Sequence, residues 1–350
     1  MEEFNPVRLR LARERRGLTK RQLAEAANLT ARSITAFESG QSAPRKPTAE
    51  ALAAALRFPE EFLFGSDPVL LQPETASFRS LSRMTAGQRH AALAAGALAH
   101  ELMQWIESRF TLPSPQIPDL RGLGPEEAAD SLRMVWTLGD APVGNMVHLL
   151  EAKGVRVFSL NLKVKEVDAF SLWVGETPMV FLNMQKTAER GRFDAAHELA
   201  HLVLHRHEPM GGKEPEKEAD AFAGCFLMPG TSVRAVATRR FVDSRSIHAL
   251  KKNWRVSALA LTRRLHDLGI FTEWRYKSVC RSVSMDVGRT SEKDGIAWET
   301  SRLLPKVFAA LRADGMQRTD VARELRIHGE DLDALVFGLV MTRVHDDSLS

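Results

Sequence analysis

Two histidines and a glutamate within five residues are the clearest chemical feature of this sequence. His197-Glu198-Leu-Ala-His201 places the histidines four residues apart, and residues at this spacing lie on one face of a helix. Both imidazoles could therefore bind one metal ion, with Glu198 beside the open coordination position. Zinc lowers the pKa of a bound water to about 7, and Glu198 would accept its proton as the water attacks a peptide carbonyl. The motif predicts the zinc-binding helix of a metallopeptidase-type site.

A catalytic zinc needs a third protein ligand, and Glu216 is the residue that we favour. It begins the run Glu216-Lys-Glu-Ala-Asp220, fifteen residues past His201. Asp220 follows one turn later on the same helical face. It could accept a hydrogen bond from the outer nitrogen of a ligand histidine, which is a contact that such sites need.

Three other residues compete for the third position. His207 has the spacing of metzincin-type sites, but Leu204 stands where those sites need a glycine for a sharp turn. His205 shares the helical face of the pair, yet a rigid helix places it about 6 Å of rise beyond His201. This distance favours a supporting or substrate-facing role for His205. Glu218 lies on another face of its own predicted helix, and it stays an alternative together with His207.

Part of the chain resembles the ImmA/IrrE-family zinc metallopeptidases. The likeness spans about residues 125–230 and rests on three stretches, which are Arg192 to Arg206, Glu216 to Ala223, and Leu227-Met228-Pro229. It implies a gluzincin-like α+β fold with a small sheet. It also implies an endopeptidase whose usual substrates are repressor-like proteins, cleaved when stress or a mobile element demands derepression.

The same resemblance carries over to single residues. His197, His201 and Glu216 match the family's metal ligands, and Glu198 matches its general base. Asp220 stands where the family often has asparagine. The sequence also departs from the family pattern outside the ligand set, with alanine at 200 in place of a frequent glycine and aspartate at 194 in place of threonine or serine.

Residues 6–64 predict a compact unit of short helices. Gly17 would end the first helix, and Thr19 would cap a second helix. Thr30 would cap a third helix, which Gly40 closes. A fourth, alanine- and leucine-rich helix is expected over 48–57.

This spacing resembles an Xre/Cro-type helix-turn-helix, in which the helix after the turn enters the major groove of DNA. Its first residues would face the bases, so we expect the reading positions to be Ala31, Arg32 and Thr35, with Ser33 near the backbone. Arg32 is the expected reader of guanine. Phosphate contacts would position the domain without specifying sequence. The residues expected to make them are Lys20, Arg21, Gln22, Arg45 and Lys46.

The remaining pattern divides the chain further. We predict helices over 85–109, 125–137, 142–153, 190–206 and 214–227, and short strands over 155–158, 169–174 and 179–183. The last strand, Met179–Asn183, is our candidate for a sheet edge that holds substrate by main-chain pairing. The starting sequence of a second HExxH-like motif, His100-Glu101, lacks the second histidine and is interpreted as helix surface.

These patterns define four expected regions. They are a helix-turn-helix domain over 1–66, a helical linker region over 67–124, a metallopeptidase domain over 125–230 and a helical C-terminal region over 231–350. In the last region, 250–269 resembles the segment that follows the peptidase in regulators with this domain order. Residues 319–325 have a helix-turn-helix pattern. The role of the C-terminal region does not follow from its sequence.

Composition sets outer limits on function. The chain has 350 residues, of which 44% are hydrophobic and 26% charged, as in a soluble protein of two or three domains. No apolar run approaches the roughly 20 residues needed to cross a membrane. The charged start does not resemble a signal segment, and the two cysteines, Cys225 and Cys280, exclude a disulfide framework and a four-thiolate zinc site. We therefore expect a cytoplasmic protein.

The basic charge is concentrated at one place. The net charge of +4 permits nucleic-acid binding without demanding it. Residues 8–21 carry seven basic side chains against the single acid Glu14. These are Arg8, Arg10, Arg13, Arg15, Arg16, Lys20 and Arg21.

Together these features predict a DNA-binding regulator fused to a zinc-dependent endopeptidase. Its expected partners are an operator in double-stranded DNA and a protein substrate, either a repressor-like or other regulatory protein or the chain itself. We expect a homodimer, because helix-turn-helix proteins bind paired half-sites. The alternative is a transcription factor or antitoxin whose peptidase-like domain only senses or binds.

Overall fold

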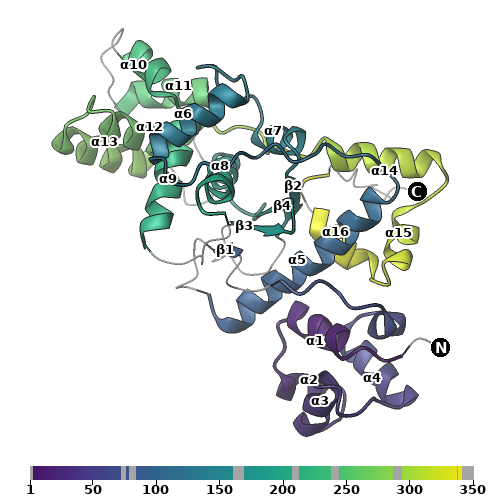
Figure 1. The fold of residues 1–350 in the computed structure, drawn as a ribbon. Coiled ribbons are helices and arrows are strands. Elements are labelled where there is room, and N and C mark those ends of the chain that lie inside the picture. Colours follow the sequence, from purple (N-terminus) through teal and green to yellow (C-terminus); the bar gives the residue numbers. More distant parts are fainter. Residues whose placement is uncertain are drawn as a thin grey trace, which may run out of the picture.

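The computed structural model describes residues 3–71, 76–78, 84–160, 169–206, 213–237, 244–286, 294–336 and 338–340. Helices dominate this part of the chain, and one small mixed sheet lies near its centre (Figure 1). The predicted class, a mainly helical protein with a terminal helix-turn-helix bundle and an α+β domain, is confirmed. None of the described helices is both long and apolar enough to cross a membrane.

The N-terminal bundle is built from short helices whose ends are set by local sequence. They are α1 (Pro6–Arg15), α2 (Lys20–Ala26), α3 (Ala31–Glu38), α4 (Lys46–Leu56) and the 3-10 helix η1 (Glu60–Phe64). Thr19 caps α2 in a reciprocal capping box with Gln22, and the Thr30 hydroxyl accepts from the Ser33 amide at the start of α3. Gly17 adopts a positive φ of 66° after α1, which a side chain would resist.

The sheet has the strand order β1-β3-β4-β2. Its strands are β1 (Ala76–Phe78), β2 (Arg156–Ser159), β3 (Ala169–Val174) and β4 (Thr177–Leu182). β3 pairs antiparallel with β1 and β4, while β2 runs parallel to β4. The prediction that 179–183 forms an edge was therefore wrong, because β4 lies between two strands. A hairpin pattern in the sequence could identify β3 and β4 as neighbours, but the parallel partner β2 and the distant β1 depend on tertiary packing.

Two long helices cover opposite faces of the sheet. α5 (Ala86–Glu107) passes closely over the stacked rings of Phe170 and Phe181, and a Cβ at Gly96 would lie 3.6 Å from the Phe181 ring. α8 (Ala188–Leu204) covers the other face, where Ser171 contacts it. Both faces of β3 and β4 are thus buried, which explains their nearly continuous apolar sequence.

The helices around α8 form the rest of the central domain. α8 packs against α9 (Lys213–Leu227) and α7 (Met146–Ala152), and α9 packs against α6 (Pro125–Val135). A further group follows in the chain and lies beside α9 (Figure 1). It comprises α10 (Gly230–Ala237), α11 (Ser244–Trp254), α12 (Ala258–Asp267) and α13 (Glu273–Asp286).

The C-terminal helices return to the N-terminal bundle. They are α14 (Leu303–Ala313), α15 (Arg318–Glu324) and α16 (Gly329–Val336), and α16 also packs against β2. Asp331 on α16 is 3% exposed and lies 2.6 Å from a guanidinium nitrogen of Arg16, the residue that follows α1. Trp105 and Arg109, around the end of α5, both donate to Glu324. Through Glu324, the segment with the predicted helix-turn-helix pattern, 319–325, contacts the end of α5.

Much of the basic cluster at 8–21 serves packing between parts of the chain. Arg8 forms an ion pair of 3.0 Å with Glu101 on α5, Arg13 pairs with Glu38, and Arg16 pairs with Asp331. The interpretation of His100-Glu101 as helix surface was wrong, because the His100 side chain is buried and Glu101 holds Arg8. Sequence patterns alone do not distinguish an arginine at a domain contact from one that faces DNA.

Candidate metal centre

The centre starts from the position of two histidines on α8. Thr187 caps this helix through the Arg190 amide, and the following seventeen residues stay helical through the histidine motif. His197 and His201 are 0% and 1% exposed, and their Nε2 atoms lie 3.1 Å apart. The helix therefore points both imidazoles at the same small space, as their spacing in the sequence predicts.

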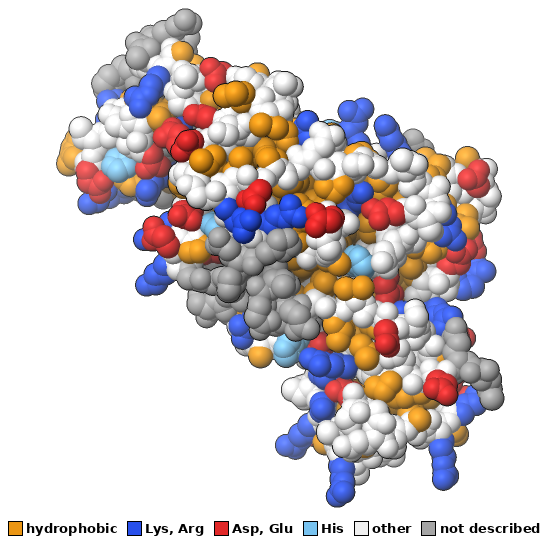
Figure 2. Space-filling view, viewed as in Figure 1, with side chains coloured by type: hydrophobic (Ala, Val, Ile, Leu, Met, Phe, Trp, Pro, Cys, Tyr) orange, Lys and Arg blue, Asp and Glu red, His pale blue; other side chains and the backbone are white. Residues whose placement is uncertain are grey.

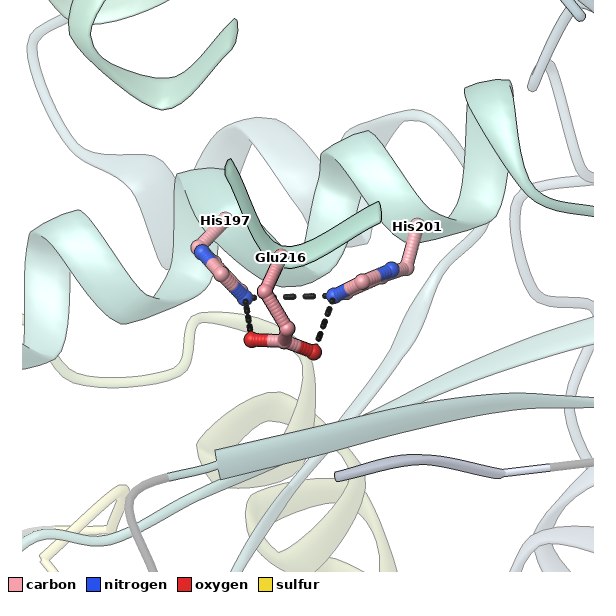
Figure 3. A group of neighbouring side chains, drawn as sticks. All are labelled: His197, His201 and Glu216. Atoms are coloured by element: carbon pink, nitrogen blue, oxygen red, sulfur yellow. Dashed lines mark hydrogen bonds and ion pairs between the residues drawn. The ribbon is translucent and has the colours of Figure 1, made fainter. Parts of the chain in front are cut away.

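Glu216 reaches the same space from α9 (Figure 3). Its Oε2 lies 3.4 Å from His197 Nε2, and its Oε1 lies 3.5 Å from His201 Nε2. A tetrahedral zinc bound at about 2.0–2.1 Å would hold its ligand atoms roughly 3.3–3.4 Å apart. The three donors form a potential metal-binding group whose ligand atoms lie within 4.8 Å of one another, and two imidazoles with a carboxylate are donors that zinc takes.

Burial and mutual hydrogen bonding set the protonation of these donors. Burial lowers the pKa of His201 to about 4 against the opposing effect of Glu216, so this ring is neutral at pH 7. Burial alone would raise the pKa of Glu216, but hydrogen bonds with His197 and His201 outweigh it and lower that pKa below its ordinary value. A neutral imidazole and an ionised carboxylate are the forms that bind a metal ion.

Two carboxylates on α9 support the histidines from outside. Asp220 Oδ1 lies 3.0 Å from His197 Nδ1, the ring nitrogen that faces away from Glu216. Glu218 Oε2 lies 2.9 Å from His205 Nε2, and His205 Nδ1 lies 3.0 Å from His201 Nδ1. Each ring of the pair thus has a polar partner on its outer nitrogen, which orients it toward the shared space.

The structure also bears on the other candidates for the third position. Glu218 faces His205, and His205 lies behind His201, so neither directs its donors into the space that Glu216 enters. His207 lies outside the described residues. The geometry therefore favours the set of His197, His201 and Glu216, and their role as ligands stays a proposal.

Glu198 is held in place by a residue that the sequence did not single out. Its Oε2 accepts a hydrogen bond of 2.8 Å from the hydroxyl of Ser171 on β3, and both residues are 0% exposed. A serine in the middle of an otherwise apolar strand was a usable signal, because buried polar groups need partners. Ser171 thereby links the sheet to the candidate general base.

The predicted DNA-contacting residues lie on one region of the N-terminal bundle. Ala31, Arg32 and Thr35 are exposed on α3, whereas the Ser33 hydroxyl lies 2.9 Å from that of Thr30 and belongs to the helix cap. Arg21, Gln22, Arg45 and Lys46 are exposed as well. Figure 2 shows lysine and arginine side chains projecting from this domain.

Several residues predicted to contact phosphate already pair with acidic side chains, including Arg21 with Glu25 at 2.9 Å and Lys46 with Glu50 at 3.9 Å. The amino group of Lys20 lies 3.5 Å from Glu38, which already pairs with Arg13. A lysine held in such a network loses part of its electrostatic attraction for phosphate. Its contact with DNA stays a prediction, as do those of the other residues.

Comparison with known families agrees with both domains. Residues 7–62 match the family model of a helix-turn-helix domain, and residues 150–266 match a peptidase family described as the IrrE N-terminal-like domain. The chain joins a helix-turn-helix domain to an IrrE-type peptidase domain. No curated protein matches the chain.

This pair of domains describes a regulator that carries a metallopeptidase-type domain. The IrrE-type match includes β2, β3, β4, α8 and α9, and therefore the entire candidate metal centre. It continues through α10 and α11 into α12, beyond the boundary at 230 that we predict from the sequence. Our four domain boundaries stay predictions.

Proposed function

We propose that the chain is a DNA-binding transcriptional regulator whose IrrE-type domain is a zinc-dependent endopeptidase. The observation that carries this proposal is the convergence of His197, His201 and Glu216 on one small space, with ligand atoms within 4.8 Å of one another. Glu198, the candidate base, follows His197 directly and is buried with it. The combination supports hydrolysis of a peptide bond.

Each residue would have a defined part in this reaction. Zinc, when bound, supplies a water of lowered pKa and polarises the carbonyl that is attacked. The Glu198 carboxylate accepts a proton from the attacking water and returns it to the leaving amine. Ser171 holds one carboxylate oxygen of Glu198, while Asp220 and His205 keep the two imidazoles oriented.

The substrate that this arrangement supports is a protein. Ion pairs hold the DNA-binding bundle to α5 and α16, and α16 packs against β2 of the peptidase domain, so cleavage would occur near regulated genes. A repressor-like or other regulatory protein fits that location, and so does the chain itself. Binding to an operator as a homodimer completes the proposal, because helix-turn-helix dimers bind paired half-sites.

A direct test compares wild type with Glu198→Gln and His201→Ala. Zinc content is measured by mass spectrometry of the purified chains, and cleaved proteins are sought by proteomics in the native host. We expect Glu198→Gln to retain zinc and lose cleavage by at least about 100-fold, the usual contribution of general acid–base catalysis. His201→Ala should lose both. A Glu198→Gln chain that cleaves a verified substrate at the wild-type rate would refute the mechanism.

A second candidate is a regulator whose peptidase-like domain senses or binds without catalysis, as in an antitoxin. The bridge from Asp331 to Arg16 favours it, since this contact would pass a change in the C-terminal helices to the DNA-binding bundle. In that case Glu198→Gln leaves regulation of a reporter gene intact, whereas Arg32→Ala abolishes it.

A further inference from the structure

β3 carries Ser171, which contacts Glu198 beside the candidate metal centre. On its outer side β3 pairs with β1, whose three residues lie outside the region that matches the peptidase family. β1 forms an antiparallel ladder with β3, in which Ala76 pairs with Leu172, Ser77 with Ser171 and Phe78 with Phe170. In the described sheet β1 has no other strand partner, so β3 would be the edge strand without it. The segment 76–78 lies between the helix-turn-helix domain and α5 in the sequence.

That edge is adjacent to the proposed catalytic residues. β3 packs against α8, and the backbone position paired with Ser77 belongs to Ser171, whose hydroxyl donates to Glu198. Figure 3 shows strands of the sheet running beneath the three side chains of the metal centre. The opposite end of the strand order, β2, is separated from β3 by β4, and α7 and α16 pack against it.

An exposed strand edge binds an extended polypeptide by main-chain hydrogen bonds, with little demand on sequence. The edge of β3 is the one edge of the described sheet that lies beside Glu198. A peptide that paired there would run alongside the residues that are proposed to hydrolyse it. The same edge carries β1 in the structure, so an incoming peptide and residues 76–78 require the same hydrogen-bonding groups of β3.

We propose that the edge of β3 is the docking site for an extended polypeptide substrate and that residues 76–78 are a tethered competitor for it. The substrate must displace β1 to pair beside Glu198. The inference rests on the proposed function, because it assumes that the docked peptide is then cleaved. The docking of a peptide can nevertheless be measured without any cleavage. Access of a substrate to the edge of β3 would then be controlled by the segment that connects the DNA-binding and peptidase domains.

The test uses full-length chains with Glu198→Gln, so that nothing is hydrolysed. The double variant Ala76→Pro/Ser77→Pro weakens strand pairing. Alternate residues of an antiparallel strand direct their backbone amides to the same neighbour, so one of these two residues donates toward β3, and proline has no amide hydrogen to donate. Ser77→Ala is the matched control, since it keeps the backbone amide. The probe is a fluorescein-labelled synthetic peptide with the sequence of residues 72–83, and its binding is followed by fluorescence anisotropy.

We expect the double-proline chain to bind the peptide at least about tenfold more tightly than the unaltered chain, because a tethered competitor acts at an effective concentration on the order of millimolar. The Ser77→Ala chain should bind as weakly as the unaltered one. Hydrogen exchange at the Ser171 and Leu172 amides should become faster in the double-proline chain and slower again when the peptide is added. Circular dichroism and zinc content check that the fold and metal centre are intact.

Two results would overturn the inference. One is equal peptide binding by the double-proline and unaltered chains together with unchanged exchange at Ser171 and Leu172. The other is cleavage within 72–83 in chains that retain Glu198, since the segment would then be a substrate. If the peptide docks as expected but no chain binds zinc or cleaves protein, the proposed catalytic function fails while the docking edge stands.

Discussion

Asp220 Oδ1 lies 3.0 Å from Nδ1 of His197, while Nε2 of the same ring lies 3.4 Å from Glu216. If a metal ion took the place of the proton on Nε2, Asp220 would accept a hydrogen bond from Nδ1–H and the Nε2 lone pair would face the metal. Asp220 and Glu216 are four residues apart on α9, so one turn of one helix contacts both nitrogens of the ring. The orientation of His197 is therefore set by the same element that brings the third donor.

The first prediction concerns this contact. Asp220→Ala should weaken zinc binding about 10- to 100-fold, because partners of a ligand histidine fix its tautomer and orientation. The zinc dissociation constant is measured by competition with a chromophoric chelator. Glu218→Ala is the matched control, since Glu218 acts on His205, one residue further from the donors. Equal losses for the two variants would argue against a specific role for Asp220.

A second prediction follows from the hydrogen bond between Ser171 and Glu198. Ser171→Ala should keep the zinc content but lower kcat by about tenfold, because the base loses a contact worth on the order of 1.5 kcal/mol for a charged acceptor. Steady-state kinetics on an identified substrate provides the measurement. Ser171→Thr keeps a hydroxyl and should recover part of the rate. Loss of zinc from the alanine variant would show that Ser171 supports the helix and not the base.

The sequence was sufficient for features that depend on residues close together. The histidine pair, the caps at Thr19 and Thr30 and the hairpin of β3 and β4 all follow from local spacing. Glu216 could be predicted as the third donor because it lies on the next helix, and two helices joined by a short connection pack together.

Features made by distant segments were not predictable in this way. The register of β1 against β3 joins residues almost a hundred positions apart, and no pattern in 76–78 marks it as part of the sheet. Arg16 and Asp331 are separated by most of the chain, so the sequence showed Arg16 only as one member of the basic cluster at 8–21. Burial and pairing decide such roles, and both depend on the assembled fold.

The third prediction concerns DNA binding. Arg32 is exposed near the start of α3, where it can reach base edges, and Lys46 is exposed at the start of α4. Arg32→Ala should reduce the free energy of DNA binding by about 1–3 kcal/mol and relax specificity at one base pair. Lys46→Ala should weaken binding to all DNA sequences alike and reduce the slope of log affinity against log salt concentration by about one. Binding to operators selected from random DNA is measured across salt concentrations. Equal loss of affinity on every sequence for both variants would assign Arg32 to the phosphate backbone.

The last prediction concerns the contact between Asp331 and the N-terminal bundle. Both carboxylate oxygens bind Arg16, at 2.6 and 2.8 Å, and one lies 4.0 Å from Arg15. Burial lowers the pKa of Arg15, and the charge of Asp331 counteracts that effect. Removing the acid therefore leaves two arginines, of which Arg15 is well buried, without their counter-charge, which is a costly state.

Asp331→Ala should thus lower the free energy of unfolding by about 2–4 kcal/mol and loosen the bundle from the C-terminal helices. Glu330→Ala is the matched control, because its partner Arg57 is exposed and such pairs contribute about 0–1 kcal/mol. Thermal unfolding measures the stability, and limited proteolysis between 66 and 85 reports the loosening. If both variants melt like wild type, the buried pair contributes no more than its exposed neighbour, and the bundle is held to the rest of the chain chiefly by the packing of α1 on α5.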